Sequence, residues 1–202
     1  MKNLLLASTF EGFGDKIDGC VGDLLKGAHV VCIPTAAYQE EGYENWLYKD
    51  IEVIKKRAKS FEELDIAKED KETIQKTLDK ANIIYLTGGH TYCLLEFMKK
   101  TGAMEIIREK VLEGVPYFGS SAGAIITSPS IDFIEDMDDP NDTELTDFSG
   151  FGFTDFFFIP HQDHEKFKEK VKDILDRNTN KKIRALNDDQ ALLVKDDIVE
   201  LI

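Results

Sequence analysis

Residues 117–126, YFGSSAGAII, place a serine where a nucleophile could stand. Gly119, Ser121 and Gly123 match the pattern G-x-S-x-G, which forms a tight turn from a strand into a helix in serine hydrolases. Residues without side chains are needed there because the chain folds back closely on itself. The helix that follows would point its unpaired, partly positive amides at the serine hydroxyl. Ser121 is therefore the predicted nucleophile.

Ser120, the preceding serine, is out of register with this pattern. Its neighbours two residues away are Phe118 and Ala122, so it lacks the flanking glycines. We expect Ser120 to be a turn residue whose hydroxyl lines or supports the substrate site. A simpler interpretation of the whole stretch is a flexible turn with a serine that caps a helix.

A serine nucleophile needs a general base, and the chain has four histidines. His161 follows the apolar run FFFIP, which predicts that it lies at the end of a buried strand. In open parallel sheets such strand ends border the ligand crevice. His164 lies three residues further on, near the start of a helix, and is the alternative base. His161 is preferred because a strand end holds a side chain more firmly.

The acid that would orient the imidazole is expected in the long polar segment between serine and histidine, residues 134–153. A loop of this length in a compact domain usually has a function or moves. Asp136 is the first choice for the acid, and spacing does not exclude Glu135 or Asp138.

A second glycine pair occurs in IIYLTGGHTYCLL, where a predicted strand ends at Gly88-Gly89 and a helix begins. The exposed backbone amides of Gly88 and Gly89, together with that of Ala122, could form an oxyanion hole. We expect His90, directly after this turn, to contact substrate together with Ser120.

Strand and helix patterns alternate along the chain, which favours a three-layer α/β/α fold with a mostly parallel sheet. Asp-Asp and Asn-Asp turn signals in the tail predict a small antiparallel addition at the C-terminal end. No linker or repeat divides the chain, so residues 1–202 are expected to form one domain. The predicted strands are 3–8, 29–34, 60–65, 82–87, 115–119 and 156–161, and the predicted helices are 15–26, 41–59, 69–80, 91–99, 104–113 and 166–177.

Composition limits the function further. A net charge of −14 would repel nucleic acid and anionic lipid, so neither is an expected partner. Three widely spaced cysteines indicate reduced thiols. The segment MKNLLLASTF is too short and too weakly charged for a signal peptide, and no apolar stretch could cross a membrane. We therefore expect a cytoplasmic protein.

Taken in order, several motifs resemble the peptidase E family, whose fold is similar to that of class I glutamine amidotransferases. They are LLLAS, VVCIPTAA, the segment YLTGGHTYCLLEFMKKTGAMEIIREKVLEGVPYFGSSAGAIITSPSI, then EDM and IPH. The resemblance covers nearly the whole chain. It implies that Ser121 is the nucleophile, His161 the base and Asp136 the acid, with an oxyanion donor from Gly88-Gly89.

Two positions depart from the family pattern. The family's G-G-N turn is Gly88-Gly89-His90 here, and the segment after the P-H pair is QDHEKFKEK, without the arginine that reads an aspartyl substrate. Lys166 or Lys168 could supply a positive charge there, although without the bidentate fork of arginine.

The sequence thus predicts a serine-type hydrolase of small peptides that needs neither metal nor organic cofactor and acts as a monomer or homodimer. The alternative is a non-catalytic relative that binds a small ligand in the same crevice. An amidotransferase-like enzyme would want cysteine at position 121, whereas Cys93 lies in a predicted helix.

Overall fold

The computed structural model describes residues 2–202 and contains a central seven-stranded sheet. Its strands are β1 (Asn3–Ala7), β2 (His29–Ile33), β3 (Ser60–Glu63), β4 (Ile83–Leu86), β5 (Tyr117–Ser120), β8 (Ala191–Lys195) and β9 (Ile198–Leu201). They lie in the order β3-β2-β4-β5-β1-β8-β9. Neighbours from β3 to β1 are parallel, and β8 and β9 are added antiparallel. The predicted α/β fold, including the antiparallel C-terminal addition, is confirmed.

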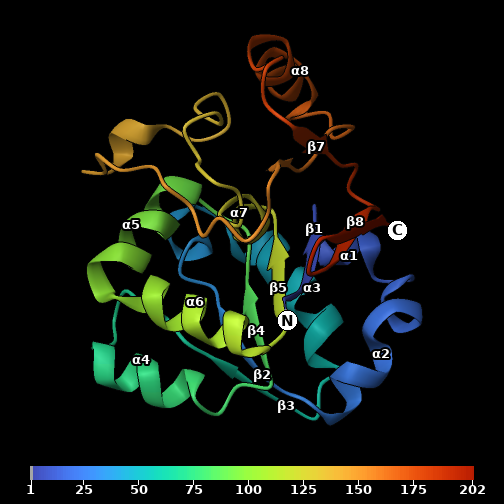
Figure 1. Cartoon of the computed structure of the whole chain (residues 1–202), viewed down its shortest axis with the longest axis vertical. Helices are drawn as coiled ribbons and strands as arrows, with labels where there is room; N and C mark the ends of the chain where they lie inside the picture. The colour runs from blue at the N-terminus through green and yellow to red at the C-terminus, as the bar shows by residue number, and fades with distance from the viewer. Residues whose placement is uncertain (1) are drawn as a thin grey trace.

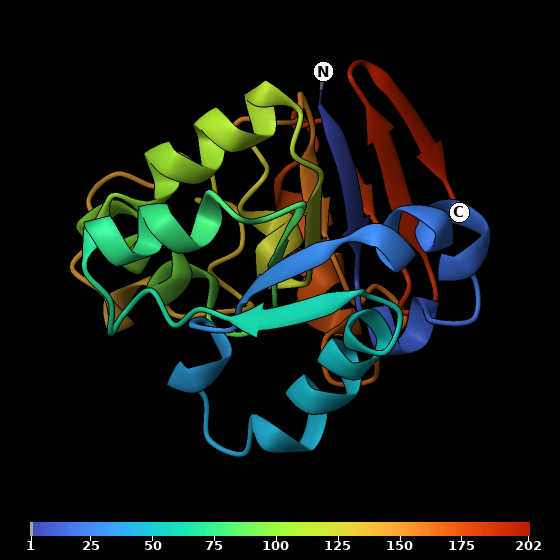
Figure 2. The same ribbon diagram turned by 90° about the horizontal axis from the view of Figure 1, so that it is seen from below.

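Helices cover both faces of this sheet (Figures 1 and 2). The helices are α1 (Phe10–Phe13), α2 (Ile17–Gly27), α3 (Glu44–Lys55), α4 (Lys71–Leu78), α5 (Thr91–Thr101), α6 (Ala103–Glu113), α7 (Ala122–Ile125) and α8 (Lys168–Arg177), with 3₁₀ turns η1 (Ala37–Gln39) and η2 (Pro140–Asp142). Within residues 2–202, none of the helices has the length and apolarity that a membrane crossing requires.

The alternation of side chains along each strand explains why helices cover both faces of the sheet. Side chains of successive residues point to opposite faces, so a strand that is apolar throughout needs a cover on each side. In β1, Leu4 and Leu6 pack into the core beneath α4, α5 and α6, whereas Leu5 and Ala7 pack into the core beneath α1, α2 and α3. The carboxyl ends of the parallel strands therefore open at one edge, where functional residues can gather.

Two elements differ from the sequence prediction. The strand predicted at 156–161 is β6 (Phe157–Ile159), and it pairs with β7 (Ile183–Ala185) in a separate two-stranded sheet instead of joining the main one. Helix α1 was not predicted, because its four residues are too few to show a helical period. It starts at an N-cap in which the Thr9 hydroxyl accepts the Gly12 amide at 2.8 Å.

The long segment between α7 and β6 is packed through aromatic side chains. The rings of Phe151 and Phe153 stack with centroids 4.7 Å apart, and Tyr117 meets both of them edge-on. All three side chains are buried. This packing holds the segment over α7 and ties it to β5.

Tyr117 also completes the short helix α7. The carbonyls of Ala122 and Ala124 accept the amides of Ile126 and Thr127, whereas within residues 2–202 the carbonyl of Gly123 accepts no backbone amide. The buried Tyr117 hydroxyl donates to that carbonyl at 2.5 Å. Loss of that donor would leave a buried carbonyl unsatisfied.

We predict that Tyr117→Phe lowers the free energy of unfolding by about 1–3 kcal/mol, the cost of an unsatisfied buried acceptor. Tyr38→Phe is the matched control, because the Tyr38 hydroxyl donates to Glu63 at an exposed position. Chemical denaturation of both variants measures the difference. Equal stability of the two would contradict the role assigned to Tyr117.

Candidate active site

Ser121 lies on the sharp turn between β5 and α7, at the carboxyl edge of the sheet. Its backbone has φ +47° and ψ −112°, a conformation that costs a non-glycine residue energy. A Cβ on Gly119 would lie 2.5 Å from the Gly123 carbonyl oxygen, and one on Gly123 would lie 2.2 Å from that of Leu86. Both glycines of the predicted motif are therefore sterically required.

The His161 ring lies beside Ser121, with Nε2 3.0 Å from the serine Oγ. Phe167 stacks on this ring, with centroids 5.0 Å apart and planes inclined by 24°. The backbone of His161 has φ +63°. Its amide donates to the buried Ser8 hydroxyl at 3.2 Å, and Ser8 in turn donates to the Leu186 carbonyl at 3.0 Å. Phe167 therefore fixes the ring of His161, and Ser8 fixes its backbone.

The carboxylate that meets the other ring nitrogen belongs to Asp188, whose Oδ1 is 2.6 Å from His161 Nδ1. A carboxylate accepts only, so Nδ1 carries the hydrogen and Nε2 is free to accept the Ser121 hydroxyl proton. Asp188 follows β7, in the turn that leads to β8. In the sequence, the pair Asn187-Asp188 indicates only a turn. Its place just after a strand end was the signal that could have found it.

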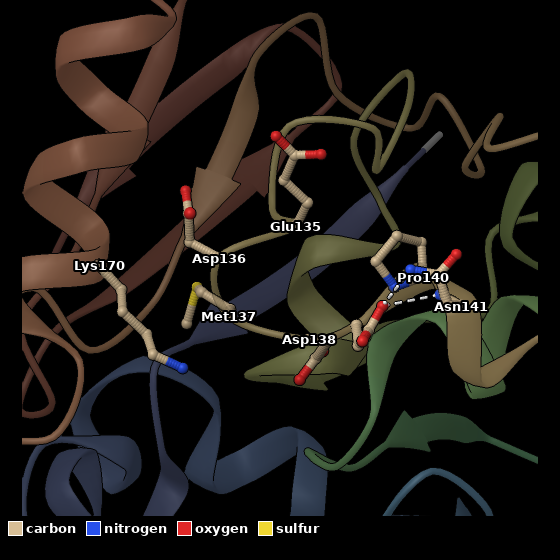
Figure 3. A pocket seen from close by; sticks show the side chains of 8 residues that line it. Glu135, Asp136, Met137, Asp138, Pro140, Asn141 and Lys170 are labelled. Carbon is tan, nitrogen blue, oxygen red and sulfur yellow. Dashed lines mark hydrogen bonds between the residues drawn. The ribbon is translucent and has the colours of Figure 1, made fainter.

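The expectation that Asp136 orients His161 is wrong. The carboxylate of Asp136 pairs with Arg177 of α8, and Glu135 pairs with the same guanidinium at 3.2 Å. These ion pairs between Glu135, Asp136 and Arg177 of α8 hold the loop in place. Figure 3 shows the side chains of Glu135 and Asp136 directed to one side of this loop and Asp138 to the other.

Asp138, the third acid weighed, accepts the amide of Thr91 at 2.8 Å at the start of α5. The loop nevertheless borders a pocket of about 520 Å³, which lies beside α8 and is drawn in Figure 3. Ser121, His161 and Asp188 do not line this pocket. Its lining residues are Glu135, Asp136, Met137, Asp138, Asp139, Pro140, Asn141 and Lys170. Over residues 2–202, no cluster of His, Cys, Asp or Glu has the geometry of a metal site.

The end of β1 supports the two ends of the Ser121–His161–Asp188 chain of hydrogen bonds. The Ala7 carbonyl accepts the Ser121 amide at 3.1 Å, and the Thr9 hydroxyl lies 3.4 Å from the Asp188 carbonyl oxygen. A Cβ on Gly12 would lie only 2.3 Å from that same oxygen. The close approach of α1 therefore fixes the backbone of Asp188.

Of the predicted oxyanion donors, Gly88 packs against Ser121 and Ala122 directly follows it. A Cβ on Gly88 would lie 3.1 Å from the Ser121 Cβ and 3.6 Å from its Oγ. Gly89 has φ +126° and approaches the Ala36 backbone so closely that a Cβ would lie 2.2 Å from it. In the hydrogen bonds of residues 2–202, the amides of Gly88 and Ala122 donate to no backbone carbonyl. Next to Ser121, these two amides thus have no backbone carbonyl as partner in the described part of the chain.

The residues assigned to substrate binding have other contacts. Ser120 is only 1% exposed and bonds to the buried Asp50, so its predicted contact with substrate is wrong, although it does support the turn. His90 is the N-cap of α5: its Nδ1 accepts the Cys93 amide at 3.3 Å, and its Nε2 lies 3.1 Å from Asp142. An imidazole thereby performs the capping that an asparagine side chain performs elsewhere.

His164, the alternative base, does not reach the serine. Its Nδ1 accepts the Lys166 amide at 3.2 Å, and its ring centroid is 6.1 Å from that of His161. His161, the histidine preferred from the sequence as the base, is therefore the one that contacts Ser121.

Charges of both signs influence the crevice. Burial raises the pKa of the half-buried Glu40 carboxyl, and the negative charge of Asp138 raises it further. Lys166, His90 and His161 lower it. The Glu40 carboxyl therefore lies within electrostatic reach of His161, Lys166 and Asp138.

Comparison with known proteins identifies relatives that are peptidases. The family model described as Peptidase family S51 matches residues 4–202. An uncharacterized peptidase of Listeria innocua is 36% identical over 201 residues, 98% of this chain and 95% of the relative. Peptidase E of Pasteurella multocida is 47% identical over 60 residues, 30% of this chain and 26% of the relative.

A solved structure extends the likeness to three dimensions. The crystal structure of a candidate peptidase E protein from Listeria monocytogenes EGD-e superposes with a TM-score of 0.93 at 34% identity, over 100% of this chain and 98% of that one. The chain therefore belongs to peptidase family S51, and it is a peptidase.

Proposed function

We propose that this peptidase hydrolyses small peptides through an acyl-enzyme on Ser121, with His161 as general base and acid and Asp188 as the orienting carboxylate. The observation that carries the proposal is the pair of contacts made by one imidazole, 3.0 Å to the Ser121 hydroxyl and 2.6 Å to Asp188. A nucleophile, a base and an orienting acid within hydrogen-bond reach form the constellation that acyl transfer requires.

In the first half of the reaction, Ser121 Oγ attacks the scissile carbonyl and its proton passes to His161 Nε2. Asp188 stabilises the resulting imidazolium. The amides of Gly88 and Ala122, with that of Gly89 nearby, donate to the oxyanion. The C–N bond then breaks, and His161 returns the proton to the leaving amine. Water then attacks the acyl-enzyme, with His161 again acting as base, and the carboxylic acid product leaves Ser121.

The restriction to small peptides follows from the resemblance to the peptidase E family. A preference for N-terminal aspartate is not part of the proposal, because residues 162–170 contain no arginine. Lys168 pairs with Glu165 at 2.7 Å, and the Lys166 ammonium lies over the Phe167 ring. Neither lysine offers the bidentate fork that recognises a carboxylate.

The proposal is tested with a panel of dipeptide p-nitroanilides and a fluorophosphonate probe. We predict labelling of wild-type protein on Ser121, and a loss of turnover on the order of a millionfold in Ser121→Ala. Mass spectrometry of the labelled protein identifies the modified residue. Wild-type protein inert to both reagents would refute the proposal, and an adduct on Ser120 would overturn the choice of nucleophile.

The identity of the acid is tested separately. Asp188→Asn is expected to lower kcat about 10⁴-fold, because an amide no longer fixes the imidazole tautomer. Asp136→Asn is the control and should change kcat less than about threefold, since it weakens only a surface ion pair with Arg177. Steady-state kinetics on one dipeptide substrate compares the two. A larger loss in Asp136→Asn than in Asp188→Asn would contradict the assignment.

A further inference from the structure

A buried carboxylate lies below the nucleophile turn and takes no part in the reaction described above. Asp50 belongs to α3 and is 6% exposed, and it lies in the largely apolar core on this face of the sheet. Burial raises the pKa of its carboxyl, and hydrogen bonds from its neighbours oppose that shift. A buried acid is costly unless its oxygens are well satisfied. Its partners therefore indicate what it does.

One oxygen of Asp50 binds the strands that carry the site. Its Oδ2 accepts the Ser120 hydroxyl at 2.6 Å and the Tyr85 hydroxyl at 2.6 Å. Ser120 and Tyr85 are themselves 3.2 Å apart. Because Ser120 is the last residue of β5, the residue held by the carboxylate directly precedes Ser121.

The other oxygen binds the start of α1. Its Oδ1 accepts the backbone amides of Phe10 and Glu11, the latter at 3.0 Å. An anion at a helix N-terminus satisfies amides that have no helical partner. The next residue of α1, Gly12, packs against the carbonyl of Asp188.

Asp50 therefore contacts one element that leads to Ser121 and another that packs against Asp188. We propose that Asp50 is a positioning residue, which fixes the distance between the Ser121 turn and Asp188 by binding Ser120 on one side and the first turn of α1 on the other. The inference rests on the proposed function, since it concerns the alignment of the proposed catalytic residues. A carboxylate with two donors on each oxygen is suited to this, because it can accept all four at once.

A positioning residue and a purely structural brace predict different results. A brace affects stability and leaves the folded protein fully active. A positioning residue changes the rate of acylation in the folded protein, since a displacement near 1 Å can cost about a hundredfold in rate. Substrate binding should be affected much less, because Asp50 is buried away from the crevice.

The primary variant is Asp50→Asn, which keeps the shape but replaces an acceptor of two hydroxyls by an amide. We predict that kcat and the rate of fluorophosphonate labelling both fall roughly ten- to a hundredfold, with KM changed less than about threefold. Rates are normalised to the folded fraction measured by circular dichroism. Glu52→Gln is the control on the same helix, because Glu52 makes only an exposed pair with Lys55. It should behave as wild type.

Two milder variants keep the test decisive if Asp50→Asn does not fold. Ser120→Ala and Tyr85→Phe each remove one donor from Oδ2, and each should lower kcat by roughly three- to tenfold. In a folded double variant, Asp50→Asn with Ser120→Ala should lose less than the product of the single losses, because the two changes remove a shared contact.

The outcomes separate the inference from the proposed function. Wild-type kcat in folded Asp50→Asn, or in both milder variants if it does not fold, would overturn the positioning role and leave a structural brace. Additive losses in the double variant would overturn the link through Ser120. Wild-type protein inert to peptides and probe would refute the proposed function, and this inference with it.

Discussion

The close approach of β4, β5 and α7 at Ser121 is the constraint on which the site depends. Three backbone segments meet there within a space that excludes a Cβ at Gly119 and at Gly123. The positive φ of Ser121 is unfavourable by itself and persists because the surroundings fix it. The Ala7 carbonyl holds the Ser121 amide, and the Thr87 carbonyl holds that of Gly123. The partly buried serine is thereby held at the carboxyl edge of the sheet.

The histidine and its acid come from a part of the chain outside the central sheet. They follow β6 and β7, which pair with each other in register from Phe157–Ile183 to Ile159–Ala185. Parallel pairing brings the carboxyl ends of both strands to one edge, so His161 and Asp188 meet although they are 27 residues apart. The buried Ser8 hydroxyl, which contacts both His161 and Leu186, joins this small sheet to β1.

Acidic residues serve different purposes in this chain, depending on where the fold puts them. The acids of the loop at 135–142 bind the guanidinium of Arg177, the amide of Thr91 and the ring of His90, and so hold α5 and α8 to the loop. Asp50, by contrast, is buried and surrounded by donors. Burial and partners, which residue type alone does not reveal, distinguish these roles.

The sequence by itself determined the α/β fold and the proposed nucleophile and base, because these depend on local patterns. Strand and helix periods need only neighbouring residues, and the elbow at Ser121 is specified by glycines two positions away on either side. His161 followed from its place after an apolar strand. The choice of Asp188 over Asp136 was decided only in three dimensions. Both carboxylates lie in loop segments, where either could orient a histidine. The pairing of β6 with β7 brings Asp188 to the imidazole, whereas Asp136 pairs with Arg177 instead.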